Sequence, residues 1–277
     1  MQFQITTLSE NCVGVGPQLL GEWGLSILVE ADNESILFDT GASISVAHNA
    51  GLLGKDLAKV DKIVLSHGHY DHTGGLRDVL RKTGSVEVIG HPDVWGPKYG
   101  CLGEYKRYIG IPFCRKELEG LGASFSLSPD PVKITSEIMT TGVVPMVTDY
   151  EEIEPYLCVE EGNTMLPDPI ADDLALIITT EQGLVVLLGC AHRGIINTLR
   201  HVQELVPGQP IDTVIGGCHL MSASQERVEQ TIHDLKEIGV RRLGTSHCTG
   251  FGPTVRLAQE FGEIFFPNNA GTSITVP

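Results

Sequence analysis

The first residues with an evident chemical use are four potential metal ligands within one short segment: His67, His69, Asp71 and His72. The apolar run at 63–65 is typical of a buried strand, and 75–81 is typical of a helix. Side chains alternate along a strand, so the first two histidines should point to one side, and the turn can bring the other two ligands to a second point nearby. Imidazole and carboxylate groups suit zinc, iron or manganese. A polar loop in which histidines cluster by chance fits this spacing poorly.

Three further histidines stand directly after predicted strands in the second half of the chain. The predicted strands at 184–188, 213–215 and 242–245 each lead into a short polar segment, and a helical pattern follows each of them. The histidines at these strand ends are His192, His219 and His247. Because each lies between a strand and a helix, we expect all three to share one rim of the fold.

Composition and charge limit the classes of function. The 277-residue chain has a formal net charge of −16, which argues against non-specific binding to nucleic acid or to an anionic membrane. No segment approaches the roughly 20 apolar residues of a membrane span, and residues 1–7 have neither the basic start nor the apolar block of a secretory signal. The seven cysteines include no Cys-x-x-Cys pair, which indicates reduced thiols. We therefore expect a cytoplasmic enzyme.

We expect one domain, 1–277, because no repeat, linker or shift in composition divides the chain. Apolar runs at 25–30 and 35–39 predict paired strands, and runs at 174–178 and 184–188 predict a second hairpin. The first hairpin ends in Asp39-Thr40-Gly41. A carboxylate at this position can orient metal ligands from behind, or it can cap the segment that follows.

Short strands with turns between them are expected from 126 to 160. Trp23 precedes the first hairpin, and a place in the core explains it better than a ligand contact does. Asp172 and Asp173 could offer a carboxylate, but adjacent acids before a strand are usually caps or face solvent.

An aromatic and locally basic segment predicts an inserted cap at 91–125. Residues 91–120 contain five aromatic residues, and five bases against four acids give a local charge of +1 in an acidic chain. Such a cap could stack on a flat ring and hold a phosphate. Alternatively, its aromatic side chains pack on the rest of the fold. The candidate substrate-binding residues are Trp95, Tyr105, Lys106, Arg107, Tyr108 and Arg115.

The segment His67-x-His69-x-Asp71-His72 resembles the signature of the metallo-β-lactamase superfamily. The resemblance implies an α+β fold, a four-layer αββα sandwich, with one or two divalent metal ions at its rim. Zinc is the expected ion, and iron and manganese are the alternatives. The superfamily pattern adds a lone histidine, a bridging aspartate after a strand and a last histidine near the C-terminus.

His247 matches the last position of that pattern, but Cys190 stands where the aspartate is expected. Cys190 could bind or bridge as a thiolate, or it could be a small buried residue. His192 follows two residues later and fits the missing histidine. The implied metal ligands are His67, His69, Asp71, His72, Cys190, His192 and His247. Asp71 and His219 are the candidate catalytic residues, and Asp39 is expected to support the ligands.

Stretches along nearly the whole chain are similar to one subgroup, the 7,8-dihydropterin-6-methyl-4-(β-D-ribofuranosyl)aminobenzene-5′-phosphate synthase-like proteins. The similar stretches are 22–26, 37–41, 66–75, 172–176, 189–194, 216–220 and 247–250. The resemblance implies a transferase that joins a pterin-methyl diphosphate to a ribofuranosylaminobenzene 5′-phosphate and releases diphosphate. The partner would be an anionic small molecule with a flat ring, and a homodimer is the assembly to test.

Two other functions remain open. One is a metal-dependent hydrolase of a phosphoester, thioester or lactone, in which Asp71 positions the attacking water or acts as its base. The other is a sensor that binds metal and ligand without turnover. A transferase would couple two substrates, a hydrolase would release an alcohol, and a sensor would bind its ligand without turnover.

Overall fold

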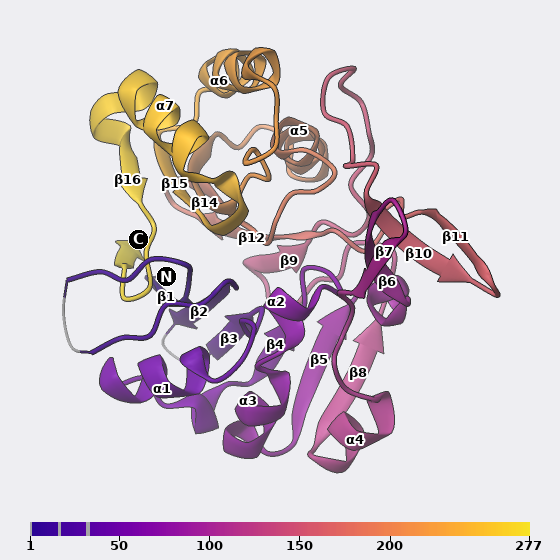
Figure 1. Cartoon of the computed structure of the whole chain (residues 1–277). Helices are drawn as coiled ribbons and strands as arrows, with labels where there is room; N and C mark the ends of the chain where they lie inside the picture. Colours follow the sequence, from indigo (N-terminus) through magenta and orange to yellow (C-terminus); the bar gives the residue numbers. More distant parts are fainter. Residues whose placement is uncertain (1, 16–17, 32–33) are drawn as a thin grey trace.

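The computed structural model describes residues 2–15, 18–31 and 34–277, and these form an α+β sandwich of four layers. Two sheets lie face to face in the middle, and helices cover the outer face of each (Figure 1). The N- and C-terminal strands pair with each other at one edge. The expected metallo-β-lactamase type of fold, with mixed sheets and helices, is therefore present.

The first sheet is built mainly from the N-terminal half. Its strands, in spatial order, are β17 (Ser273–Val276), β1 (Phe3–Ser9), β2 (Ser26–Ala31), β3 (Glu34–Phe38), β4 (Lys62–Val64), β5 (Val86–Gly90) and β8 (Ala123–Leu127). The helices beside it are α1 (Ser45–Leu52), α3 (Leu76–Thr83) and α4 (Arg115–Gly120). The predicted hairpin at 25–39 is confirmed as the antiparallel pair β2–β3, although its turn lies partly outside the described residues.

The second sheet comes from the C-terminal half. Its strands, in spatial order, are β16 (Phe265–Pro267), β15 (Arg242–Ser246), β14 (Ile211–Gly217), β13 (Gly183–Leu188), β12 (Ala175–Thr180) and β9 (Ile138–Thr140). The outer helices are α5 (Ile195–Leu205), α6 (Gln225–Ile238) and α7 (Phe251–Phe261). The predicted hairpin at 174–188 is confirmed as β12–β13, and β13, β14 and β15 run parallel. Their carboxyl ends therefore meet at one edge of the sheet.

Alternating side chains explain why these strands stack in layers. Along β2, Ile27 and Val29 join the core between the two sheets, whereas Leu28 joins the core under the first set of helices. A third core lies between the second sheet and α5–α7. Local signals fix the helix ends: the Ser224 hydroxyl accepts from the Arg227 amide at the start of α6, and Gly239 ends it in the left-handed conformation.

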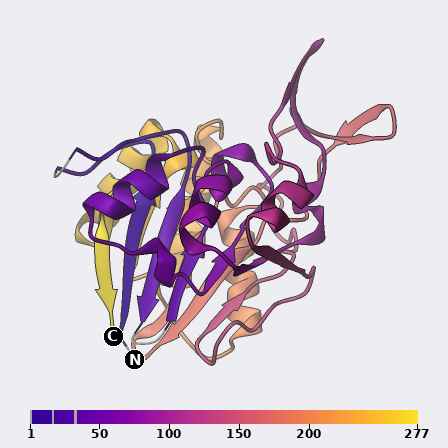
Figure 2. The ribbon, with the colours of Figure 1, turned by 90° about the horizontal axis from the view of Figure 1, so that it is seen from below.

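A small third sheet stands apart from the sandwich. Its strands, in spatial order, are β11 (Thr164–Pro167), β10 (Leu157–Glu161), β6 (Lys98–Leu102) and β7 (Tyr105–Tyr108). Figure 2 shows its two hairpins projecting beyond the layers. We call these four strands the accessory sheet.

The segment predicted as a cap at 91–125 is divided between this accessory sheet and the sandwich. Its 98–108 hairpin belongs to the accessory sheet, but β8 belongs to the first sheet of the sandwich and α4 to the helices beside that sheet. The expectation of repeated short strands from 126 to 160 is wrong for 141–156, where the described backbone is irregular. Among the described residues, no helix combines the length and the apolar character that crossing a membrane requires.

Candidate metal centre

Four loops meet at one end of the sandwich. The loop after β4 leads through a short helix, α2 (Tyr70–Thr73), and carries the cluster at 67–72. The loops after β13, β14 and β15 carry the three later histidines, and their rings contact the first cluster or one another. His192 and His219 have ring centroids 4.1 Å apart, and His72 and His247 have centroids 5.0 Å apart. The shared rim predicted from the strand ends is present.

His67, His69 and His192 form one potential ligand group, with donor atoms within 4.8 Å of one another. All three are buried, and neither ring nitrogen of His192 has a hydrogen-bond partner among the described residues. Burial lowers the pKa of His69 to about 3 and holds the pKa values of His67 and His192 well below the usual range. Nε2 of His69 also has no hydrogen-bond partner among the described residues. Neutral, buried imidazoles with such unpartnered nitrogens are suited to a metal ion.

Asp71, His72 and His247 form a second group beside the first. The Oδ2 atom of Asp71 lies 3.3 Å from Nε2 of His247. Burial alone would raise the pKa of Asp71, but the adjacent His247 ring and the other nearby imidazoles outweigh it and lower that pKa. The carboxylate is therefore ionised, as a metal ligand must be.

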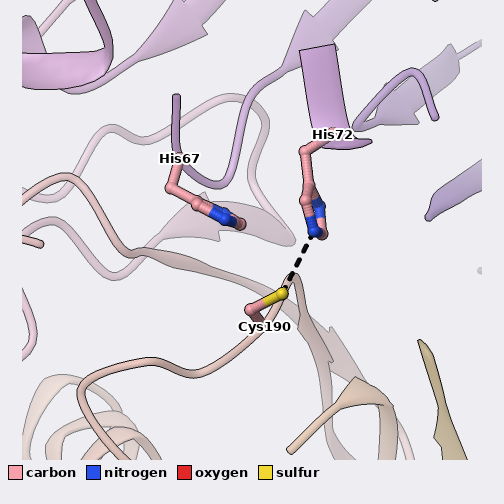
Figure 3. A group of neighbouring side chains, drawn as sticks. All are labelled: His67, His72 and Cys190. Carbon is pink, nitrogen blue, oxygen red and sulfur yellow. Dashed lines mark hydrogen bonds between the residues drawn. The ribbon is translucent and has the colours of Figure 1, made fainter. Parts of the chain in front are cut away.

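Cys190 lies between the two groups. Its Sγ atom is 3.1 Å from Nε2 of His72, and its donor atom is grouped both with His67 and His72 and with His192 and His219. Figure 3 shows His67, His72 and Cys190 converging on one point. Burial raises the pKa of the Cys190 thiol well above its usual range without a metal, but a metal ion deprotonates a coordinating thiol outright. Cys190 also forms a potential ligand group with His247 and Cys248. These imidazole, carboxylate and thiol donors fit one or two divalent metal ions.

Asp39 lies behind His72. Its Oδ2 atom is 2.7 Å from Nδ1 of His72, and its Oδ1 accepts from the Ser66 amide at 2.7 Å. Burial opposes charge on His72, but the Asp39 carboxylate outweighs it and raises the His72 pKa to about 9. A carboxylate on the far nitrogen fixes both the ring orientation and the tautomer of a ligating histidine.

His247 is held from behind by the N-terminal segment, a contact that the sequence patterns did not indicate. Asn11 Oδ1 lies 2.9 Å from His247 Nδ1, and Glu10 Oε1 accepts from the His247 amide at 2.6 Å. The pairs are separated by 236 and 237 residues. The Asn11 contact leaves Nε2 of His247 directed toward Asp71.

Asp172 and Asp173 are buried, so the expectation that they are caps or face solvent is wrong. Asp172 accepts from the Gly68 amide at 2.7 Å and pairs with Lys98 at 2.8 Å. Asp173 accepts from the Arg193 amide at 2.8 Å. One acid thus supports the loop that carries the first histidines, and the other supports the loop after His192.

His219 faces the cavity beside the ligand groups, and its Nε2 atom lies 3.2 Å from Glu154 Oε2. Burial opposes a charge on this ring, but the neighbouring Cys248 and Glu154 raise the His219 pKa to about 10. Its Nδ1 atom is buried and has no hydrogen-bond partner among the described residues. No sequence pattern pointed to Glu154.

Strained backbone accompanies the site. Four non-glycine residues at or just after strand ends have positive φ: Asp39 (60°), Ala191 (51°), His219 (46°) and His247 (54°). Such conformations cost on the order of 1–3 kcal/mol each and persist where surrounding contacts enforce them. Their concentration on the loops that carry potential ligands marks these loops as a functional site.

A cavity of about 190 Å³ opens above the potential ligands. Trp23, Tyr70, Arg107 and Met221 are among the residues that line it. Trp23 is 42% exposed, and its ring lies 4.8 Å from that of His247, so the expectation of a core aromatic is wrong.

The predicted substrate-binding residues separate into two sets. Arg107 lines the cavity, whereas the others are not among its described lining residues. Trp95 packs on Phe125, and Arg115 pairs with Glu119 and lies over the same phenyl ring. The remaining three, on the exposed β7 strand, are Tyr105, Lys106 and Tyr108.

Known proteins share this fold over its full length. The family model of the metallo-beta-lactamase superfamily matches residues 24–255. The chain is 33% identical, over 98% of its length and 96% of the relative, to the 7,8-dihydropterin-6-methyl-4-(beta-D-ribofuranosyl)-aminobenzene-5′-phosphate synthase of Methanocaldococcus jannaschii. It is 34% identical to an uncharacterized protein of that organism, over 87% of this chain and 90% of the relative. A solved metal-dependent hydrolase of the beta-lactamase superfamily is 29% identical, with a TM-score of 0.87 and 99% of each chain covered.

Proposed function

The chain belongs to the metallo-beta-lactamase superfamily and is a metal-dependent enzyme of that fold, and from this premise we propose that it is a transferase. The reaction would join a pterin-methyl diphosphate to the amine of a ribofuranosylaminobenzene 5′-phosphate, with release of diphosphate. The observation that carries the proposal is the 33% identity to one such synthase across 98% of the chain.

The donor set supports chemistry on an anionic leaving group. One or two divalent ions held by the seven ligands would supply positive charge that neutralises a departing diphosphate. Three neutral histidines, His67, His69 and His192, add no charge of their own, and Asp71 and Cys190 supply the anionic donors. The bound ions would therefore keep part of their positive charge for the diphosphate.

Three side chains are placed to act on the substrates. His219 presents the unpartnered Nδ1 atom from the cavity wall while Glu154 holds its other nitrogen, so the ring can hold a proton beside a substrate amine or oxygen. Asp71, ionised and also part of the cavity lining, can orient a metal ligand or accept a hydrogen bond from the attacking group. Arg107 supplies positive charge at the opening.

Hydrolysis is the second candidate, and one observation favours it. The solved relative with a TM-score of 0.87 is described as a metal-dependent hydrolase. The same ligand set would serve a reaction in which water replaces the arylamine, with Asp71 as the group that orients that water.

The two candidates separate in one assay. Metal-loaded protein is mixed with the pterin-methyl diphosphate and the ribofuranosylaminobenzene 5′-phosphate, and the products are separated chromatographically. Transfer predicts a coupled product and diphosphate in equal amounts, with diphosphate release dependent on the amine. Pterin alcohol formed at the same rate without the amine contradicts transfer and supports hydrolysis.

Matched variants show whether the product comes from this site. His192→Ala removes a buried potential ligand and should abolish coupling, whereas His233→Ala removes a histidine that is 70% exposed on α6 and should leave it unchanged. Coupling that survives His192→Ala at the wild-type rate contradicts the assignment of the reaction to this centre.

A further inference from the structure

Two large apolar side chains remain exposed at the mouth of the metal-site cavity. Trp23 is 42% exposed and Met221 is 56% exposed, and both line this cavity. Apolar surface that stays open beside a polar site marks a place where a ligand is covered. Neither side chain takes part in the steps of the proposed reaction.

The position of Trp23 is fixed by backbone packing. The Leu25 amide donates to the Asp71 carbonyl at 3.2 Å, and Gly24 lies so close that an added Cβ would be 2.6 Å from that same carbonyl oxygen. The segment 23–25 is therefore pressed against the turn that carries Asp71. As a result the indole is held at the opening, tilted by 49° to the His247 ring.

Met221 is fixed in a comparable way. Its amide donates to the Cys248 carbonyl at 3.2 Å, and an added Cβ on Gly250 would lie 2.8 Å from the Met221 Cβ. Gly250 is thus required for Met221 to sit over the loop after β15. A thioether and an indole held in place on the lining of one opening present surfaces against which an aromatic ring can pack.

Arg107 adds a positive charge to the same opening. Its guanidinium lies 5.1 Å from the centroid of the Tyr70 ring, and the Tyr70 amide donates to the Ile109 carbonyl at 2.8 Å, which ties the base of the hairpin to the metal-binding loop. Among the residues that the structure describes, no carboxylate forms an ion pair with Arg107. In a chain of net charge −16, an arginine left without an acidic partner at a site opening is suited to an anion from outside.

The cavity size limits what can enter. A cavity of roughly 150 Å³ takes one benzene molecule, so the volume of about 190 Å³ has room for one ring. A second ring system must therefore extend through the opening, past Trp23, Met221 and Arg107.

We propose that this opening is the subsite for the phosphate-bearing aryl acceptor, with its ring against Trp23 and Met221 and its phosphate on Arg107. The assignment rests on the proposed transferase function for the identity of the acceptor. It places the acceptor phosphate on Arg107 of the accessory sheet and leaves the potential metal ligands to the diphosphate. The accessory sheet then selects for an acceptor that carries a phosphate.

A single-tryptophan protein tests the subsite directly. The chain has two tryptophans, and Trp95 packs on Phe125 outside the described lining of the cavity, so Trp95→Phe leaves Trp23 as the only indole. Zinc-loaded Trp95→Phe protein is titrated with phenyl phosphate, with phenol and with inorganic phosphate while Trp23 fluorescence is followed. We expect saturable quenching by phenyl phosphate and at least about tenfold weaker binding of the other two probes, because each offers only half of the contacts.

Arg107→Met in the same background should weaken phenyl phosphate about tenfold, the loss expected for one charge-assisted contact, and leave phenol unchanged. Lys106→Met, on the exposed neighbour in β7, is the matched control and should change neither affinity. Unchanged phenyl phosphate affinity in Arg107→Met, with loss of binding on removal of zinc, would place the phosphate on the metal and overturn the proposal. Coupling by the wild-type protein is measured separately, so failure of the subsite and failure of the transferase function give different results.

Discussion

The Nδ1 atom of His72 lies 2.7 Å from Oδ2 of Asp39, and its Nε2 atom faces the Sγ atom of Cys190 at 3.1 Å. One imidazole therefore connects the first strand pair of the sandwich to a loop of the second sheet. Asp39 also accepts from the amide and hydroxyl of Ser66, so both of its oxygens are hydrogen-bonded. These contacts set the direction in which His72 presents its Nε2 atom.

Asp39→Asn should lower metal affinity about 10- to 100-fold, because an amide cannot both accept from Ser66 and hold the same His72 tautomer. Competition with a coloured chelator measures the affinity. Asp56→Asn is the control, since Asp56 only caps a short helix at Leu57–Lys59, away from the site. Equal affinity in wild type and Asp39→Asn would show that Asp39 acts only as a structural residue.

Lys98→Met should destabilise the fold by about 3–5 kcal/mol, because it leaves buried carboxylates without their cation. Lys98 is 2% exposed and pairs with Asp168 and Asp172 at 3.0 and 2.8 Å. Lys62→Met removes an ion pair with Glu87 that is about one-third exposed, and it should cost only about 0–1 kcal/mol. Urea unfolding of metal-free protein measures both free energies. Similar losses in the two variants would contradict a buried ionic link between the accessory sheet and the metal-binding loop.

Asp173→Asn should change how stability depends on pH. Burial raises the pKa of Asp173 from its ordinary value of 3.8 to about 7. The folded state therefore favours the protonated carboxyl, and the stability contributed by this preference is complete below pH 3.8 and is lost as pH rises through about 7. The free energy of unfolding of metal-free wild type should fall relative to that of Asp173→Asn between these pH values. Urea unfolding at several pH values checks this, and parallel curves for the two proteins would disprove it.

Local patterns in the sequence were sufficient for the two hairpins and for the shared rim of histidines, whereas the four-layer sandwich was implied by the family resemblance. The apolar runs at 25–30 and 35–39 predict paired strands, and the structure pairs them as β2 and β3. The three later histidines could be predicted at one rim because each follows a strand of a parallel set.

Contacts between distant segments had no such signal. Asn11 reaches His247 across 236 residues, and Lys98 reaches Asp172 across 74. Nothing near Asp172 in the sequence shows that a lysine will neutralise it, so the sequence alone predicts a cap residue or an acid that faces solvent. Trp23 was expected in the core for a similar reason: its hydrophobicity is local, whereas its exposure depends on the turn at Asp71 that packs against Gly24.

The central claim is that these four loops form one metal centre and that the Cys190 thiolate is one of its ligands. X-ray absorption at the zinc edge of zinc-loaded protein measures it most directly. We predict a sulfur neighbour at about 2.3 Å beside nitrogen and oxygen at about 2.0–2.2 Å, with the sulfur lost in Cys190→Ser and kept in Cys248→Ser. A spectrum with nitrogen and oxygen neighbours alone, the same in wild type and Cys190→Ser, would contradict the account.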